Sequence, residues 1–156
     1  MTEGNSEATL DLEDILKRLN ESQDALLAAL KEVGSDRFDV EASNGTSAKR
    51  SLERTVDDLN LYYGSLVANC LNLPQSPLLE KSDFATLREG TMALQVAQRR
   101  FTNLLHDILP QDLEKTATDE RQATYSLRQL LEMTTAHYHL RVKQLDALGD
   151  RASASG

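Results

Sequence analysis

The sequence predicts an all-α fold, and more narrowly a four-helix bundle with long interhelical connections. Apolar residues recur every three or four positions in four separate segments, which is the spacing of one face of an α-helix. No segment alternates apolar and polar residues as a half-buried strand does. At 156 residues, the chain is long enough to bury one hydrophobic core without disulfides or a structural metal.

The first helix is predicted from about Leu10 to Val33. Acidic residues occupy its first turn, where they favour the helix dipole, and Gly34 is placed to end it. Its apolar stripe consists of Leu12, Ile15, Leu16, Leu19, Leu26, Leu27, Leu30 and Val33.

The second helix is predicted to begin near Thr46 or Ser47, either of which can cap it, and to end before Pro74. Its stripe consists of Leu52, Val56, Leu59, Tyr63, Leu66, Val67 and Cys70. The uncharged stretch 59–79 is about long enough to cross a bilayer. Its asparagines and prolines would leave unsatisfied polar groups in hydrocarbon, so we expect no membrane span.

The third helix is predicted to start at Ser82 or Asp83 and to end before Pro110. Its stripe is Phe84, Leu87, Leu94, Phe101, Leu104, Leu105 and Ile108. The fourth begins with a capping box, in which the side chains of Ser126 and Gln129 satisfy free amides of the first turn. Its stripe continues through Leu127, Leu130, Leu131, Thr134, His137, Arg141, Leu145 and Leu148.

These helices define one predicted domain, residues 10–148. The connections 34–46 and 72–81 are longer than the tight turns of a minimal antiparallel bundle. Residues 1–9 and 149–156 are polar and small, and we predict that both are disordered.

Composition narrows the partners and the compartment. Twenty-five acidic residues against seventeen basic ones give a net charge of -8, which repels nucleic acid. The single cysteine, Cys70, forms no intramolecular disulfide, and its place on the helix stripe predicts a buried, inert thiol. The N-terminal residues lack the features of a secretory signal, so the sequence favours a cytoplasmic location.

Three stretches of the chain carry a resemblance to a known family. They read SAKRSLERTVDDLNLYYGSL, LREGTMALQVAQRRFTNLLHDILPQDLEKT and SLRQLLEMTTAHYHLRVKQL. They are similar to the second helix, the third helix with its following loop, and the fourth helix of the DinB-like (DinB/YfiT) superfamily of four-helix bundles. The resemblance covers roughly residues 10–148.

The resemblance implies that histidines from the second and fourth helices bind one divalent metal, such as zinc or nickel, and that thiol-dependent transfer or isomerisation is one activity of the family. In this chain, aligning Gln144 with the family glutamine places His137 and Arg141 at the two ligand positions of the fourth helix. The ligand position of the second helix falls on Thr55 or Arg54. We prefer Thr55, because Arg54 points away from the apolar stripe. His137 is then the only surviving ligand, and we expect no metal cofactor.

The remaining polar residues have structural interpretations. His139 projects from the face of the helix opposite His137, and His106 is predicted on the surface. Arg141 is expected to pair with Asp58, or failing that with Asp57, because a buried arginine usually requires an acid. Tyr62, Tyr63 and Tyr138 either line a pocket or pack in the core.

Three functions follow from these observations. The leading hypothesis is a non-catalytic small-molecule-binding or scaffolding protein whose candidate pocket contains Thr55, Asp58, Tyr62, His137 and Arg141. The alternative is a thiol-dependent transferase or isomerase, using either a metal held by His137 and Asp58 or an anion held by Arg141. The third is an unrelated helical protein-interaction module. The uncharged segment 61–73, together with the family resemblance, predicts a homodimer.

Overall fold

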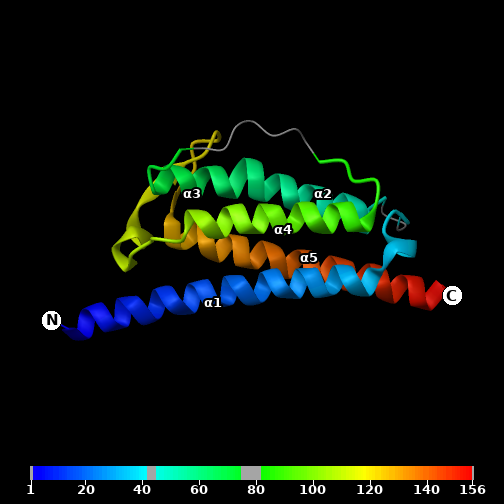
Figure 1. Ribbon diagram of the computed structural model, residues 1–156, viewed down its shortest axis with the longest axis horizontal. Coiled ribbons are helices and arrows are strands. Elements are labelled where there is room, and N and C mark those ends of the chain that lie inside the picture. The colour runs from blue at the N-terminus through cyan, green and yellow to red at the C-terminus, as the bar shows by residue number, and fades with distance from the viewer. Residues whose placement is uncertain (1, 42–44, 75–81, 156) are drawn as a thin grey trace.

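Four helical rods lie side by side along the molecule in the computed structural model, which describes residues 2–41, 45–74 and 82–155 (Figure 1). The first is α1 (Thr2–Val33) and the last is α5 (Leu127–Ser155). The second consists of α2 (Ala48–Asp57), the π-helical segment η2 (Asp58–Tyr63) and α3 (Gly64–Cys70). The third is α4 (Leu87–Leu104). The predicted all-α class is confirmed for most of the described chain.

The second and third rods run in the same direction and are not antiparallel (Figure 1). α1 packs against α5, and α2 packs against α4. α3 ends at one end of the molecule, whereas α4 begins at the other, so α4 runs in the same direction as α2 (Figure 1). The 3-10 helices η1 (Ser35–Arg37) and η3 (Pro110–Glu114) lie in the connections after α1 and α4.

Local residues determine most helix ends. Gly34 adopts φ 76° directly after α1, a conformation that glycine takes without steric cost, so its predicted role as a stop is confirmed. The Ser47 hydroxyl accepts a hydrogen bond from the Arg50 amide at 3.1 Å and caps α2. The Ser126 and Gln129 capping box is also present, with hydrogen bonds of 2.9 and 3.1 Å.

The predicted start of the third helix was wrong. Thr86, rather than Ser82 or Asp83, caps α4, and its hydroxyl accepts from the Glu89 amide at 3.1 Å. The earlier residues lie outside the helix, and acids of α2 accept hydrogen bonds from two of their amides. The Ser82 amide donates to Asp57 at 2.9 Å, and the Phe84 amide donates to Glu53 at 2.8 Å.

A short hairpin departs from the all-helical prediction. Strands β1 (Thr116–Thr118) and β2 (Thr124–Ser126) pair antiparallel, with Ala117 opposite Tyr125. Each strand has three residues, which is too short for an alternating pattern to be detected from sequence. The hairpin lies between η3 and α5 and forms part of the groove described below.

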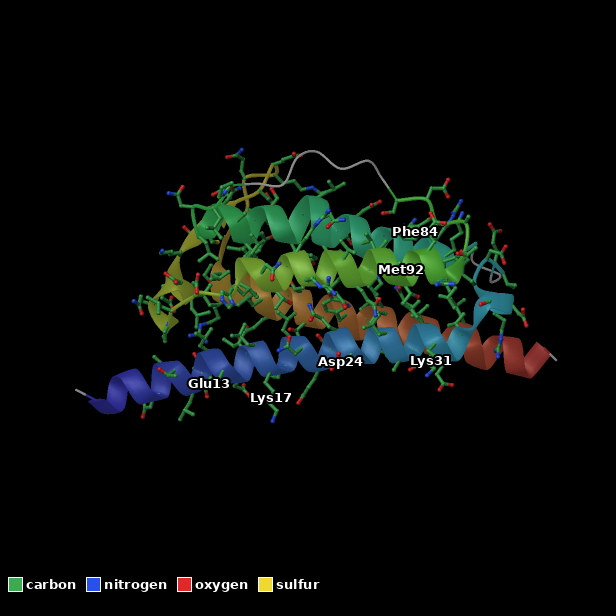
Figure 2. All side chains as sticks on the ribbon, viewed as in Figure 1. Glu13, Lys17, Asp24, Lys31, Phe84 and Met92 are labelled. Carbon is green, nitrogen blue, oxygen red and sulfur yellow. The ribbon has the colours of Figure 1, made fainter. Side chains whose placement is uncertain are left out.

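One continuous core occupies the space between the rods. The predicted stripes supply it, while charged residues of α1 such as Glu13, Lys17, Asp24 and Lys31 project away from the other helices (Figure 2). Tyr138, which the sequence left open as a pocket residue, is completely buried in this core. Its largest fully buried members include Tyr138, Phe101, Ile15, Leu19, Leu26, Leu30, Leu52, Leu94, Leu113, Leu127, Leu130 and Leu131.

The helices extend beyond the limits drawn from the sequence pattern. α1 begins at Thr2 and α5 ends at Ser155, within the segments 1–9 and 149–156 that were predicted to be disordered. The described parts of both segments contain no proline, so nothing forces the backbone to leave the helix. Among the described residues, no helix has the length and apolar character required to span a membrane.

Candidate functional site

A π-helical turn interrupts the second rod. The amide of Gly64 donates to the carbonyl of Leu59, five residues earlier, instead of four as in an α-helix. A Cβ atom on residue 64 would lie 2.5 Å from that carbonyl oxygen, so the close approach requires glycine. Because this turn holds an extra residue, Tyr63 returns to the side of the helix that carries Asp58.

A groove of about 720 Å³ runs beside this turn. One wall comes from η2 and α3, the other comes from the hairpin, and His137 reaches it from α5. Most of its large lining side chains are aromatic or charged. The lining residues used below are Asp58, Tyr62, Tyr63, Asp119, Glu120, Arg121, Ala123, Tyr125 and His137.

Asp119 fixes the hairpin turn and joins it to η2. Its Oδ1 accepts hydrogen bonds from the amides of Arg121 and Ala123 at 2.9 and 3.0 Å, as in an Asx turn. Its Oδ2 accepts from the Tyr62 hydroxyl at 3.0 Å. The Ala123 amide is the largest cause lowering the Asp119 pKa, while burial raises the pKa of Tyr62 above its ordinary value. The contact therefore joins a carboxylate to a neutral phenol.

Asp58 connects η2 to α5 behind the groove. Its Oδ2 lies 3.3 Å from His137 Nε2 and 3.7 Å from an Arg141 terminal nitrogen. The predicted pairing of Arg141 with Asp58 is confirmed, whereas Asp57 accepts the Ser82 amide. His137 Nε2 is buried but not aligned for a hydrogen bond with that carboxylate. Burial lowers the Arg141 pKa, and the nearby Asp58 charge opposes that shift.

Aromatic rings form a continuous edge along the groove. The centroids of Tyr62 and Tyr63 lie 5.0 Å apart with the rings nearly perpendicular. Those of Tyr63 and His137 lie 5.6 Å apart. Burial, followed by the Asp58 charge, raises the pKa of Tyr63. Tyr125 lines the groove from the hairpin.

The five pocket residues proposed from sequence divide into three groups. Asp58, Tyr62 and His137 line the groove. Arg141 contacts Asp58 and donates to Gln144 at 3.0 Å, outside the groove lining. Thr55 is buried, and its hydroxyl donates to the Ser51 carbonyl at 2.8 Å.

Sequence reasoning missed the hairpin side of the groove. Asp119, Arg121 and Tyr125 lie in a stretch with no helical stripe, so they were not considered. The signal that would have found them is the run TATDERQATYS, in which threonines and a tyrosine flank an acidic turn. Tyr63 was placed on the apolar stripe and left open as either a pocket or a core residue, and it lines the groove.

The other histidines and the cysteine lie where the sequence predicts. His106 has 83% of its side chain exposed, and His139 is also exposed. Cys70 is buried, and burial raises its thiol pKa. In the part of the chain that the structure describes, no three His, Cys, Asp or Glu side chains are grouped so that they could hold a metal ion.

Comparison with protein families, curated proteins and solved structures finds no match to this chain. The resemblance to the DinB-like superfamily therefore stays a prediction from the sequence. A functional proposal can rest on three features: the groove, the π turn beside it, and the ion pair between Asp58 and Arg141.

Proposed function

We propose that this chain is a non-catalytic helical binding protein that holds a small molecule in the groove between η2, α3 and the hairpin. We further propose that the chain is a DinB-like bundle that has lost its metal site, of which His137 is the last remaining ligand. The observation that carries the proposal is the groove of about 720 Å³ with Tyr62, Tyr63, Tyr125 and His137 in its lining. Ligand sites generally have volumes of about 300–1,000 Å³ and a lining rich in aromatic side chains.

The polar groups around the groove favour binding over catalysis. Asp119 is committed to the hairpin turn and to Tyr62, and Asp58 is shared by His137 and Arg141. Thiol-dependent transfer would need a group that stabilises a thiolate within the groove. Arg141, the residue predicted for that role, faces Asp58 instead, and Arg121, which lines the groove, lies in the same turn as the carboxylates of Asp119 and Glu120.

We also propose that the chain forms a homodimer, and the exposed residues of the segment 61–73 decide where two copies can meet. Of the uncharged segment 61–73, Leu61 and Leu73 are each 40% exposed, whereas Leu66, Val67 and Cys70 are buried within the chain. A dimer would have to use the exposed ends of this segment. Light scattering from micromolar to near-millimolar concentration measures this directly, and a constant mass of 17.3 kDa would reject the dimer.

The four tyrosines provide a test of the groove itself. Tyr62, Tyr63 and Tyr125 line it, while Tyr138 is buried in the core and serves as an internal reference. Protein labelled with fluorotyrosine is screened by fluorine NMR against small aromatic compounds that are cationic, neutral or anionic. We expect at least one compound to shift the three groove signals and leave the Tyr138 signal in place.

A blocked variant and a matched control complete the test. Ala123→Trp places a large ring in the groove, whereas Ala28→Trp places the same ring on the exposed face of α1. The shifts should disappear in the first variant and persist in the second. The proposal fails if no compound shifts the groove tyrosines, or if the shifts survive Ala123→Trp.

A further inference from the structure

The groove lining carries more negative than positive charge. Three carboxylates line it, those of Asp58, Asp119 and Glu120, whereas Arg121 is the only lysine or arginine among the lining residues. The ordered hairpin turn and the π turn hold these carboxylates on opposite walls. Arg141, 3.7 Å from Asp58 and outside the lining, offsets part of this charge, but Asp119 and Glu120 still outnumber Arg121, so the field inside the groove favours a cation over an anion.

Two of these carboxylates retain capacity for a ligand. Glu120 is exposed, and within the described residues no hydrogen bond or ion pair engages its side chain. Asp58 directs Oδ2 toward His137 and Arg141, yet 41% of its side chain remains exposed. Neither acid takes part in the hydrogen bonds that hold the hairpin turn, so a cation that approaches either of them leaves those bonds intact.

The aromatic edge adds a second, independent attraction for cations. Faces of phenol rings attract ammonium groups that lie within about 6 Å of the ring centroid. Tyr62 and Tyr63 present rings at nearly right angles, 5.0 Å apart, and Tyr125 stands in the other wall. Because the two rings differ in orientation, they offer faces in more than one direction, which suits a rounded alkylated ammonium better than a flat molecule.

We infer that the ligand of this groove is a small organic cation, a quaternary ammonium or alkylated amine held between the tyrosine rings and the carboxylates of Asp58 and Glu120. This inference rests on the proposed binding function and specifies its ligand class. A groove of about 720 Å³ leaves room for a substituent beyond the charged group.

Three probes that share one benzyl group separate charge from shape. Benzyltrimethylammonium is the cation, benzyl alcohol the neutral compound and phenylacetate the anion. Each is titrated into wild-type protein carrying labelled tyrosines, at low and at high salt. We expect the cation to bind about tenfold more tightly than the neutral compound, with an advantage that shrinks at high salt, and the anion to bind weakest.

Substitutions of opposite sign test the charge argument. Glu120→Gln should weaken binding of the cation about twofold to fourfold at low salt, because an exposed charge acts through water. Arg121→Gln should strengthen it by a similar factor. Glu32→Gln, on the exposed face of α1, removes the same charge elsewhere and should change little.

Two substitutions of Tyr63 test the contribution of the aromatic rings. Tyr63→Leu removes a ring face and should weaken binding of the cation about threefold to tenfold, whereas Tyr63→Phe keeps the face and should bind nearly as wild type does. Thermal melts of both variants show whether the fold is retained.

The outcomes distinguish this inference from the proposed function. If benzyl alcohol or phenylacetate shifts the groove tyrosines as tightly as the cation, the ligand class is wrong and the binding function stands. If no probe or screened compound shifts them, both fail. If the cation binds best but Glu120→Gln and Arg121→Gln act in the same direction, the assignment of its charge contacts is overturned.

Discussion

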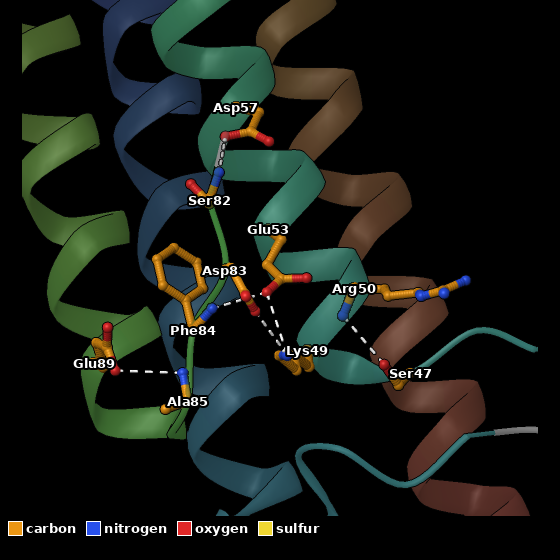
Figure 3. A network of polar contacts seen from close by, with 10 residues as sticks. All are labelled: Ser47, Lys49, Arg50, Glu53, Asp57, Ser82, Asp83, Phe84, Ala85 and Glu89. Atoms are coloured by element: carbon orange, nitrogen blue, oxygen red, sulfur yellow. Dashed lines mark hydrogen bonds and ion pairs between the residues drawn. The ribbon is translucent and has the colours of Figure 1, made fainter. Parts of the chain in front are cut away.

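The two halves of the second rod use their polar side chains differently. In α2, Lys49, Glu53 and Asp57 lie one turn apart and all bind the segment that precedes α4 (Figure 3). Lys49 pairs with Asp83 at 3.0 Å and with Glu53 at 3.7 Å. In η2, Asp58 and Tyr62 line the groove, and they contact side chains and not backbone amides. Asp58 contacts His137 and Arg141, and Tyr62 donates to Asp119.

The difference follows from what each half faces. The segment beside α2 is extended, so its free amides are donors that Glu53 and Asp57 accept. The hairpin beside η2 satisfies its turn amides through its own Asp119. Asp58 and Glu120, the other two carboxylates that line the groove, are therefore not taken up by the backbone amides of the hairpin turn. In this comparison α2 fastens the connection, whereas η2 and α3 line the groove that we propose as the binding surface.

The largest expected effect comes from the residue that permits the π turn. Gly64→Ala forces a methyl group against the Leu59 carbonyl and should lower the free energy of unfolding by about 2–3 kcal/mol. It should also displace the Tyr62 and Tyr63 signals. Chemical denaturation and tyrosine NMR measure both effects. Ser65→Ala, at the next position, is the control, and a Gly64→Ala protein as stable as the control would refute the role of the turn.

The second effect tests the fastening half. Glu53→Ala removes the carboxylate that accepts the backbone amide of Phe84. We expect it to lower the free energy of unfolding by about 2 kcal/mol, since charge-assisted hydrogen bonds are the stronger class. Only 16% of the Glu53 side chain is exposed. Glu21→Ala on the exposed face of α1 should change the stability little. Urea melts of the two variants compare them directly, and equal stabilities would contradict the fastening role.

A smaller effect is expected from the ion pair in the binding half. A buried pair loses about 3–5 kcal/mol when one partner is removed. Here only 12% of the Arg141 side chain is exposed, but 41% of the Asp58 side chain is, and the contact is 3.7 Å long, so water reaches and weakens the pair from the Asp58 side. Asp58→Asn should therefore cost about 1 kcal/mol. A loss above 3 kcal/mol in urea melts would show that the pair is buried in solution.

The smallest effect is an acid loosening of the groove. Hydrogen bonds from backbone amides, that of Ala123 first, lower the pKa of Asp119. The Leu109 amide and Lys115 lower the pKa of Asp112 in the same way. Depressed values mean that both acids stabilise the fold above the ordinary carboxyl range and lose this effect as pH falls through their folded pKa. Tyr62 and Tyr125 signals should thus change before that of Tyr138 on acidification. Simultaneous changes of all signals would contradict separate loosening.

Much of the helical frame could be predicted from the sequence, because apolar spacing and caps such as Gly34, Ser47 and Ser126 act locally. The groove could be predicted only in part. Asp58, Tyr62 and His137 were found from their positions around the predicted helices. The π turn depends on a hydrogen bond from the Gly64 amide to the Leu59 carbonyl, which no periodic pattern reveals. The start of α4 does carry a local signal that was overlooked, because Thr86 is followed three residues later by Glu89 and its hydroxyl accepts the Glu89 amide.

The central claim is that the groove beside η2 is a ligand site for an organic cation. A crystal structure of the protein with benzyltrimethylammonium tests it most directly. We expect the ammonium group to lie within about 6 Å of the tyrosine ring centroids, with the Asp119 turn unchanged. Probe density elsewhere on the molecule, with the groove unoccupied at saturating concentration, would contradict the account.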